Sequence, residues 1–361
     1  NVFVHSLTKN FKYMLKDEIS NRIIKVKNNQ NGFKQNYKKY SSMTGLNWLK
    51  TFTLTENKNL KSSLYSLSLI NKNHKFKIPI IIKNKNHVSD FGIVIQTNTM
   101  HAYNDWGGGS FYKYLINDNT KRLITNEISK DRPIYGAFSS DHLLRGTLPF
   151  LKWAHQNGYN FEILADNDLS KKNKTLNRIK TLVFVSHSEY WTPDMYKCIE
   201  NFTLKGGNLI SLSGNIAYYK TLENKRILVS RKDESYHLNG QRGGYWHLLN
   251  KPASKVFGTK YDSSGYATFA PYEVLNPNHW VFKGLNLKKG DLIGNFGKGA
   301  SGSELDKIDK FSPKNLIHLA TGKNKYNGTR VHGADMIYYE NQYGSKIFST
   351  GSITSVHKIK E

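Results

Sequence analysis

The sequence predicts an α/β protein with a doubly wound, mainly parallel sheet at its centre. Short apolar runs of strand length alternate with segments of helical length from residue 89 onward, an order that forms parallel sheets covered by helices. Further β-rich stretches stand before and after that region. We therefore expect a β-sandwich-like N-terminal region at residues 1–88 and an α/β domain at residues 89–361 with β-rich C-terminal additions.

The composition is that of a folded chain. Its 361 residues are 38% hydrophobic and 13% aromatic, enough to bury a sizeable core. No run approaches the roughly 18 apolar residues of a membrane-spanning helix, so we expect no membrane segment. The first residue is Asn1 rather than Met, which indicates a piece or a processed product of a longer chain. Both a cytoplasmic and an exported protein fit these features.

The net charge of +26 comes from 53 Lys and Arg against 27 Asp and Glu. Such a charge attracts polyanions, so nucleic acid is one candidate partner. The excess is mostly lysine, however, spread along the chain and mixed with asparagine. The sequence has no zinc-finger spacing, no RNP motif and no arginine-rich helix. We expect a solvated basic surface rather than a nucleic-acid interface.

Three segments of the N-terminal region have the pattern of strands. Residues 51–55 and 64–69 alternate apolar with polar side chains, as half-buried strands do. Residues 77–82 form a third apolar run. Pro79 within it indicates an edge strand, because proline lacks the N–H that a central ladder needs.

The α/β domain is expected to contain four buried strands. Each is a short apolar run, at residues 91–96, 160–164, 181–186 and 208–212. Two later strands, at residues 336–339 and 346–349, are expected to pair as a hairpin.

Two helices are expected between these strands. Ser140 and Asp141 offer an N-cap for the first, which Pro149 should kink. Thr192 caps the second, Pro193 occupies its first position, and Gly206-Gly207 ends it.

Polar clusters follow three of the expected strands, at residues 99–112, 187–191 and 213–215. Ligands bind beyond the carboxyl ends of the strands in open parallel sheets. We therefore expect the three clusters to meet in one crevice, which makes this end of the sheet the candidate site.

Each cluster on its own allows two interpretations. Gly107-Gly108-Gly109 is either a tight turn that needs positive φ or a phosphate cradle, although it matches neither a P-loop nor a dinucleotide fingerprint. His187 and Glu189 are two residues apart, which places both on one face of a strand. They are either a metal ligand with a proton-handling neighbour or a buried hydrogen-bonded pair.

The one cysteine, Cys198, tests a rival class of enzyme. The expected sheet is of the glutamine amidotransferase-like or flavodoxin-like type, and class I glutamine amidotransferases need a cysteine nucleophile at a strand-to-helix elbow. The elbow here, residues 187–191, has no cysteine, and Cys198 falls inside the following helix. We interpret it as a packed core thiol.

The motifs in combination are more specific. Residues 102–108 (Ala-Tyr-Asn-Asp-Trp-Gly-Gly) and 110–112 (Ser-Phe-Tyr) resemble the N,N-dimethylformamidase large (β) subunit family, in particular its C-terminal domain. Residues 187–192 are similar to that family's His-x-Glu-Tyr-Trp segment, and residues 206–215 to its next strand and strand end. Two weaker motifs match downstream, at residues 302–306 and 351–353.

The resemblance implies an amidase-like catalytic domain with a mononuclear iron held by two tyrosines and a glutamate. The matching positions are Tyr103, Tyr112 and Glu189, with Tyr135 and Tyr190 as alternatives to Tyr112. The positions that match the other polar residues of the family's site, implied as catalytic, are His187, Asn215 and Glu304.

These residues form a coherent hydrolytic site. Two phenolates and a carboxylate are hard donors that suit Fe(III), with another divalent metal as the alternative. The ion would polarise an amide carbonyl and activate water. His187 or Glu304 would pass a proton to the departing amine, and Asn215 would donate a hydrogen bond to the substrate or the oxyanion. The structural alternatives are a turn cap for Asn215 and a surface loop for Glu304.

The resemblance implies a metal-dependent hydrolase of the C–N bond of a small-molecule amide. The formamidase also has a lectin-like domain and a small partner subunit; we expect neither in this chain, so dimethylformamide itself is not implied as the substrate. A homo-oligomer is compatible with the sequence. The alternative from another class is a non-catalytic module that binds a sugar or a peptide on an amidotransferase-like scaffold.

Overall fold

The computed structural model describes residues 1–38, 41–55, 60–72, 74–83, 88–112, 123–134, 142–170 and 174–357. The chain divides into two compact units. Unit 1 consists of Asn1–Val88, Met100–Ser140 and Leu222–Ser230, and unit 2 of Ser89–Thr99, Asp141–Thr221 and Arg231–Glu361. None of the described helices has the length together with the apolar character that a bilayer crossing demands.

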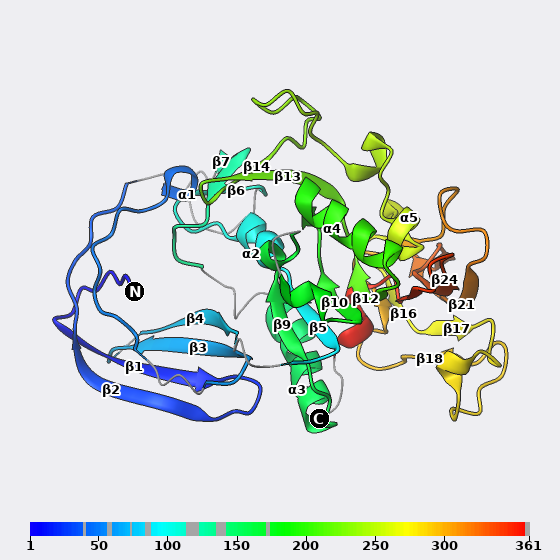
Figure 1. Ribbon diagram of the computed structural model, residues 1–361, viewed down its shortest axis with the longest axis horizontal. Coiled ribbons are helices and arrows are strands. Elements are labelled where there is room, and N and C mark those ends of the chain that lie inside the picture. The colour runs from blue at the N-terminus through cyan, green and yellow to red at the C-terminus, as the bar shows by residue number, and fades with distance from the viewer. Residues whose placement is uncertain are drawn as a thin grey trace. The chain divides into compact units, whose positions relative to one another are not determined.

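The N-terminal part of unit 1 is a four-stranded antiparallel sheet (Figure 1). Its order is β2-β1-β3-β4, from β1 (Asn10–Asp17), β2 (Ile23–Asn31), β3 (Ser63–Ile70) and β4 (Lys75–Ile82). The expected strands at 64–69 and 77–82 are confirmed as β3 and β4, and Pro79 lies on an edge strand.

Two expectations for this region are wrong. Residues 51–55 form no strand, and Phe52 makes only an isolated bridge to Val2. The β-sandwich-like arrangement is also absent from the described N-terminal residues, which form a single sheet. Most residues of β2 are exposed, so this strand offers no second apolar face on which another sheet could pack.

Unit 1 also contains several short elements beyond this sheet. They are α1 (Ser41–Thr44), β6 (Gly109–Ser110) parallel to β7 (Leu123–Ile124), and β8 (Glu127–Ser129) antiparallel to β14 (Ile227–Ser230). Helix α2 (Thr97–Tyr103) and strand β13 (Tyr219–Asn224) each have residues in both units.

A nine-stranded mixed sheet dominates unit 2. Its order is β18 (Leu292–Ile293), β17 (Tyr272–Val274), β21 (Ile317–Gly322), β24 (Asp335–Glu340), β25 (Lys346–Ser349), β12 (Asn208–Gly214), β10 (Thr181–His187), β5 (Phe91–Ile95) and β9 (Glu162–Ala165). Neighbours are parallel from β25 to β9 and antiparallel from β25 to β18.

The predicted fold class is therefore wrong. The described residues are β-rich, with 35% strand against 19% helix. The N-terminal sheet is antiparallel and the large sheet of unit 2 is mixed, so neither is a doubly wound parallel sheet of the amidotransferase-like or flavodoxin-like type. The four predicted buried strands do exist as β5, β9, β10 and β12, and β24 with β25 forms the predicted hairpin. The error lies after β12, where long helices that could return the chain for further parallel strands are missing from the described residues, and the strands pair antiparallel instead.

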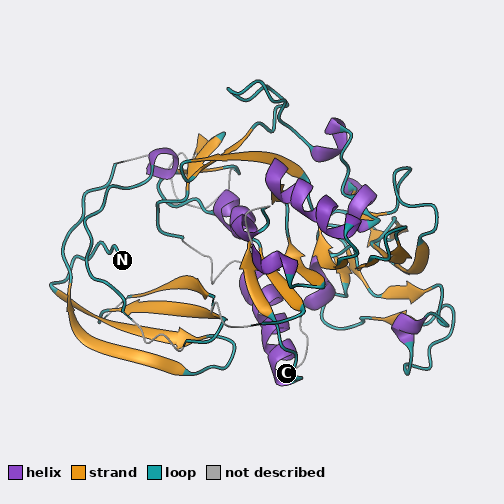
Figure 2. Cartoon of the chain, viewed as in Figure 1, coloured by secondary structure: helices purple, strands orange, loops and turns teal. Residues whose placement is uncertain are grey.

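The two predicted helices differ in how closely they follow expectation (Figure 2). Helix α4 (Pro193–Leu204) is confirmed, with Thr192 as its N-cap. The caps expected at Ser140 and Asp141 lie outside the described residues. The described chain begins there with a π-helix (His142–Thr147), which runs directly into α3 (Leu148–Gln156). Pro149 stands in the first turn of α3, close to the change from π-helix to α-helix.

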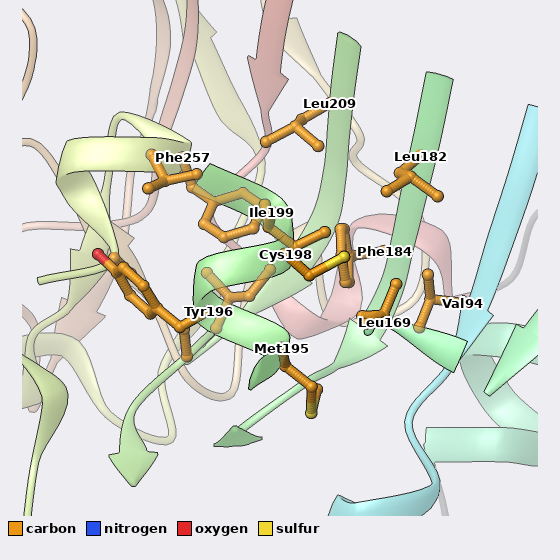
Figure 3. Packing of buried hydrophobic residues seen from close by; sticks show 14 of the residues in the cluster. Val94, Leu169, Leu182, Phe184, Met195, Tyr196, Cys198, Ile199, Leu209 and Phe257 are labelled. Carbon is orange, nitrogen blue, oxygen red and sulfur yellow. The ribbon is translucent and has the colours of Figure 1, made fainter. Parts of the chain in front are cut away.

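Helix α4 packs on the parallel part of the sheet. Figure 3 shows Cys198 and Ile199 of α4 among side chains that include Phe184 of β10 and Leu209 of β12. Burial raises the pKa of the Cys198 thiol to about 11. The interpretation of this residue as a core thiol is thus confirmed.

The remaining elements of unit 2 are short. The helices are α5 (Ser254–Phe257) and single 3₁₀ turns at Asp166–Asp168, Lys174–Asn177, Trp246–Leu249, Ser263–Gly265, Trp280–Phe282 and Ile353–Val356. The strands are β11 (Tyr190–Trp191), β15 (Lys260–Tyr261), β16 (Phe269–Ala270), β19 (Ser301–Gly302), β20 (Asp306–Lys307), β22 (Lys325–Tyr326) and β23 (Thr329–Arg330).

Candidate active site

His187 and Asn215 meet because their strands are parallel neighbours. His187 is the last residue of β10 and pairs in register with Gly214, the last residue of β12, so Asn215 follows directly beside it. The imidazole Nδ1 lies 3.1 Å from the carbonyl oxygen of Gly214. Because that oxygen can only accept, Nδ1 carries a proton, and Nε2 is turned toward the carboxylates of the site.

Two glutamates lie at Nε2 of His187. Oε2 of Glu189 is 3.2 Å from it and Oε2 of Glu304 is 3.7 Å away. Both His187 and Glu189 are buried. Burial lowers the pKa of His187, but Glu304 and Glu189 outweigh it and raise this pKa to about 9. The pKa of Glu304 is raised by burial and by the neighbouring Glu189.

The side-chain amide of Asn215 joins the two carboxylates. Nδ2 donates to Oε2 of Glu304 at 2.7 Å and to Oε1 of Glu189 at 3.4 Å. Its oxygen Oδ1 is buried and meets no hydrogen-bond donor among the described residues. The backbone N–H of Asn215 donates to Asp306 at 2.6 Å, and burial raises the pKa of this buried aspartate to about 7.

The backbone is strained at three points of this cluster. Ser186, Asn215 and Ser303 have φ values of 67°, 53° and 70°, a region of backbone conformation that residues other than glycine seldom occupy. Ser186 directly precedes His187, Asn215 belongs to the cluster itself, and Ser303 directly precedes Glu304. Such residues gather where a fold holds functional groups in fixed positions.

Glycines allow the segment of Glu304 to reach the strand end. A Cβ on Gly214 would lie 2.1 Å from the carbonyl oxygen of Glu304, so only glycine fits there. The backbone N–H of Gly302 donates to the hydroxyl of Ser352 at 2.8 Å, and that of Asp306 to the carbonyl of Gly351 at 2.7 Å. The two weaker sequence motifs therefore hold one another in place.

Residues 188–191 continue from the site into the core. Thr99 Oγ1 accepts the backbone N–H of Glu189 at 3.0 Å, which fixes the turn after β10. Trp191 is buried in the core and donates its indole N–H to the carbonyl of Ser188 at 2.9 Å.

The structure adds Lys232, which no sequence motif indicated. Its ammonium lies 4.5 Å from the ring centroid of Tyr219 and 5.4 Å from that of Tyr190. Burial lowers its pKa to about 8, while the charges of Glu189 and Glu304 act in the opposite direction. Lys232 is thus a cation near the two carboxylates, held over an aromatic pair whose rings stack at 5.2 Å.

A second histidine stands beside His187. The ring of His142 is centred 4.6 Å from that of His187, at 45°. Burial lowers the pKa of His142 well below its usual value, and His187 and His357 lower it further. The two neighbouring imidazoles therefore have pKa values shifted in opposite directions, a pairing that no sequence motif indicated.

The two predicted tyrosine ligands lie together in unit 1. The rings of Tyr103 and Tyr112 are centred 4.4 Å apart, tilted by 32°. The backbone N–H of Phe111 donates to the carbonyl of Ala102 at 3.2 Å, which closes the loop between them. Gly107 and Gly108 have φ values of 87° and 91°, so the tight-turn interpretation of this glycine run is confirmed.

The predicted metal-ligand positions thus fall into two groups, described separately: the tyrosine pair in unit 1, and Glu189 with His187, Asn215 and Glu304 in unit 2. Tyr135 lies outside the described residues, and Tyr190 stacks on Tyr219. Among the residues that the structure describes, no three His, Cys, Asp or Glu side chains are arranged to hold a metal ion.

Comparison with known proteins covers most of the chain. It is 24% identical over 329 residues to the N,N-dimethylformamidase beta subunit of Paracoccus aminophilus, covering 74% of this chain and 42% of that protein. It is 25% identical over 281 residues to the N,N-dimethylformamidase beta subunit of Alcaligenes sp, covering 65% and 36%. The chain therefore spans less than half the length of either relative.

A solved structure, the mmIFT52 N-terminal domain, matches with a TM-score of 0.32 and 14% identity, covering 59% of this chain and 81% of that one. A family model described as "N,N-dimethylformamidase beta subunit-like, C-terminal" matches residues 19–360. This chain belongs to the N,N-dimethylformamidase beta subunit-like, C-terminal family.

Proposed function

We propose that this chain carries the catalytic part of an amide hydrolase, which cleaves the C–N bond of a small-molecule amide. Family membership supports the reaction class. The structural observation that carries the proposal is the arrangement around His187. Its Nε2 faces the buried carboxylate of Glu189 and the partly buried carboxylate of Glu304, and the side-chain amide of Asn215 bridges the two. Such a cluster can hold and move protons out of contact with bulk water.

In the proposed hydrolysis, Glu304 and His187 each carry out one proton transfer. Glu304 takes a proton from the attacking water while the water oxygen bonds to the carbonyl carbon. His187 gives the proton on Nε2 to the nitrogen of the breaking C–N bond, so that the products are a carboxylic acid and an amine. The proton held by Glu304 then returns to His187, from which it lies 3.7 Å away.

Asn215 has a different role from the one expected from sequence. Its Nδ2 is already engaged by the two carboxylates, so it is not the donor to an oxyanion. Its buried Oδ1 is an acceptor, and it accepts a hydrogen bond from the attacking water or from an N–H of the substrate.

The proposal includes one metal ion, with Tyr103, Tyr112 and Glu189 as its ligands. The donor chemistry fits, because two phenolates and a carboxylate balance the charge of Fe(III), and the two phenol rings lie side by side in unit 1. When bound, such an ion polarises an amide carbonyl and makes water more acidic.

Metal analysis joined to a visible spectrum tests this part. We expect close to one iron per chain and a purple-to-brown tyrosinate band. Tyr103→Phe and Tyr112→Phe should weaken the band, and Glu189→Ala should lose the metal. Folded protein that is colourless and metal-free, or a Glu189→Ala variant that keeps all its metal, would contradict it.

The amide itself is identified by a substrate panel. Amine release is measured with small amides that include N,N-dimethylformamide, other formamides, and amides with an acidic group, which the net charge of +26 would attract. Release from at least one amide is expected. If none is hydrolysed while a sugar or peptide binds, the chain is a binding module.

We also propose that the chain works as an assembly. The curated relatives are each named as a subunit. Light scattering after size exclusion should give a mass above the 41.4 kDa of one chain. A mass of one chain at all concentrations tested would contradict self-association.

A further inference from the structure

Arg132 is a buried cation in unit 1 that bonds to backbone carbonyls. Only 7% of the residue is exposed. Its Nε donates to the carbonyl of Ser129 at 2.9 Å. Nη1 donates to the carbonyls of Trp106 at 2.5 Å and Gly109 at 3.3 Å, and Nη2 to that of His101 at 3.2 Å. All four acceptors are therefore main-chain oxygens.

Three of these four acceptors belong to one short segment. His101, Trp106 and Gly109 lie on the stretch of chain that carries Tyr103 and leads to Tyr112. The guanidinium therefore bonds to this stretch at three points, through the carbonyls of His101, Trp106 and Gly109. A planar fork with five donors in fixed directions can do this, and an ammonium group cannot.

The neighbouring bonds support the same geometry. The side chain of Asn104 donates to the carbonyl of Pro133, the residue after Arg132, at 2.9 Å. The carbonyl of Ala102 accepts the N–H of Phe111, and the Tyr112 N–H donates to the hydroxyl of Ser110 at 3.0 Å. Hydrogen bonds from Arg132 therefore hold the segment together, and the bonds of Phe111 and Tyr112 close its C-terminal end.

Burying a guanidinium without a carboxylate is costly, so the position demands an explanation. Four carbonyl dipoles compensate the charge here, and they do so only while the segment keeps its path. The charge of the Arg132 guanidinium is compensated only by these carbonyl groups, and the segment that carries three of them is held by the guanidinium. Each therefore stabilises the position of the other.

We propose that Arg132 is a positioning residue that holds residues 101–112 so that Tyr103 and Tyr112 stand as a preformed pair of phenol donors. The role of the pair as metal ligands rests on the proposed function. Arg132 itself touches neither substrate nor metal. It acts through the carbonyls of the segment.

The test compares Arg132→Lys and Arg132→Met with Arg226→Met in the full chain. Arg226 is a matched control, because it is an arginine of the same unit whose exposed side chain pairs with Asp131. The first readout is hydrogen exchange of the amides of Phe111 and Tyr112. The second is the position and intensity of the tyrosinate band per bound iron. Thermal unfolding reports whether each variant folds.

Exchange at residues 102–112 should become at least about tenfold faster in both Arg132 variants, since charged hydrogen bonds are lost, while strands β1 to β4 keep their protection. Arg132→Lys should fold and yet show the effect, because charge without the fork does not suffice. The band should shift or weaken in both variants, and Arg226→Met should match the wild type.

Unchanged exchange at residues 102–112 in Arg132→Lys, or faster exchange spread evenly over unit 1, would overturn the proposal. The exchange readout does not depend on metal. If the wild type binds no iron, the proposed function fails, while local loss of protection in Arg132→Lys still shows that Arg132 positions the tyrosine segment. If the wild type shows the iron band and both Arg132 variants keep it unchanged with normal exchange, only the positioning role fails.

Discussion

The side-chain nitrogen of Asn215 lies 2.7 Å from Oε2 of Glu304, a residue 89 positions further along the chain. The same nitrogen reaches Oε1 of Glu189 at 3.4 Å. One neutral amide therefore stands between a buried carboxylate, that of Glu189, and a partly buried one, that of Glu304, which would otherwise repel each other. This relationship fixes the spacing of the acids that face His187 and leaves the oxygen of Asn215 as an acceptor.

Replacing Asn215 should therefore affect both stability and activity. Asn215→Gly removes the amide without straining the positive φ of this position. Because the buried carboxylate of Glu189 and the partly buried carboxylate of Glu304 lose a donor, the free energy of unfolding should fall by about 1–3 kcal/mol, and amide hydrolysis should slow. Urea denaturation and an amine-release assay measure the two effects.

Asn250→Gly is the matched control for this change, since Asn250 also has a positive φ but is exposed. It should alter stability by a few tenths of a kcal/mol at most. Equal effects of the two substitutions would show that backbone conformation alone, rather than the bridge between carboxylates, explains the asparagine at 215.

Gly214→Ala should disturb the site through the backbone. The new Cβ would lie 2.1 Å from the carbonyl oxygen of Glu304, so the segment that carries this glutamate must move. We expect amide hydrolysis to slow at least about tenfold, because a displacement of about 1 Å is enough to misplace a proton-transfer group. The measurement is kcat/KM.

Gly92→Ala controls for overpacking, because its Cβ would meet side-chain tips in the core of β5. Both variants should lose about 1–3 kcal/mol of stability, and only Gly214→Ala should lose activity. Loss of activity in both would attribute the effect to general destabilisation.

Asp335 should make the stability of unit 2 depend on pH. Its buried carboxylate lies 3.0 Å from Nε2 of His318 and 3.1 Å from Nε2 of His332, and accepts the N–H of Ile308 at 3.0 Å. Burial raises the pKa of Asp335, but the close contacts with His318 and His332 outweigh it and hold the pKa well below its usual value. The pKa of His332 is raised by the same contact.

The two shifts act in different pH ranges. The lowered carboxyl pKa contributes stability that is present above the unfolded value of about 4 and is lost as the pH falls toward the folded pKa. The raised pKa of His332 contributes stability that is present below about 6.5 and is lost as the pH rises through the folded value. Stability from this contact should therefore be greatest between about pH 4 and 6.5.

Urea denaturation as a function of pH measures this contribution. Asp335→Asn should lower the free energy of unfolding by about 1–3 kcal/mol near pH 5 and flatten the loss toward acid. Asp291→Asn is the control, because Asp291 lies in a loop and its carboxylate also accepts a backbone N–H, that of Lys288. A pH profile unchanged by Asp335→Asn would contradict the assignment.

Cys198 should be dispensable for catalysis. Its thiol is buried beneath α4 and its pKa is raised by burial, so little thiolate forms near neutral pH. We expect Ellman's reagent to label native protein slowly at pH 8 and unfolded protein at once, and Cys198→Ala to keep its kcat. Rapid labelling of native protein with loss of activity would point to a thiol nucleophile instead.

The elements that could be predicted from sequence are those with a strong local signal. β10 contains an apolar run at residues 182–185 and is buried along its whole length, and α4 begins with a capping threonine followed by proline. The antiparallel half of the large sheet was missed, because strands such as β17 and β18 are only two or three residues long and their pairing is set by distant partners. Alternation at residues 51–55 does not lead to a strand, since among the described residues this segment pairs only through the isolated bridge between Phe52 and Val2.

The sequence predicts which site residues lie together where those residues stand at the ends of neighbouring strands. His187 and Asn215 follow from parallel neighbours in register, and this local geometry holds although the sheet as a whole is mixed. Glu304 came from resemblance, and its approach depends on Gly214, which only the structure explains. Lys232 carries no local signal, because its place over Tyr219 is a product of tertiary packing.

Amine release by Glu304→Gln, compared with the wild type on the best amide of the panel, shows whether Glu304 takes the proton from the attacking water. Glutamine keeps the volume and can still pair with Asn215, but it cannot take a proton from water. We expect kcat to fall by about 10²- to 10⁴-fold with the thermal midpoint nearly unchanged. A folded Glu304→Gln variant that releases amine within about twofold of the wild-type rate would contradict the account.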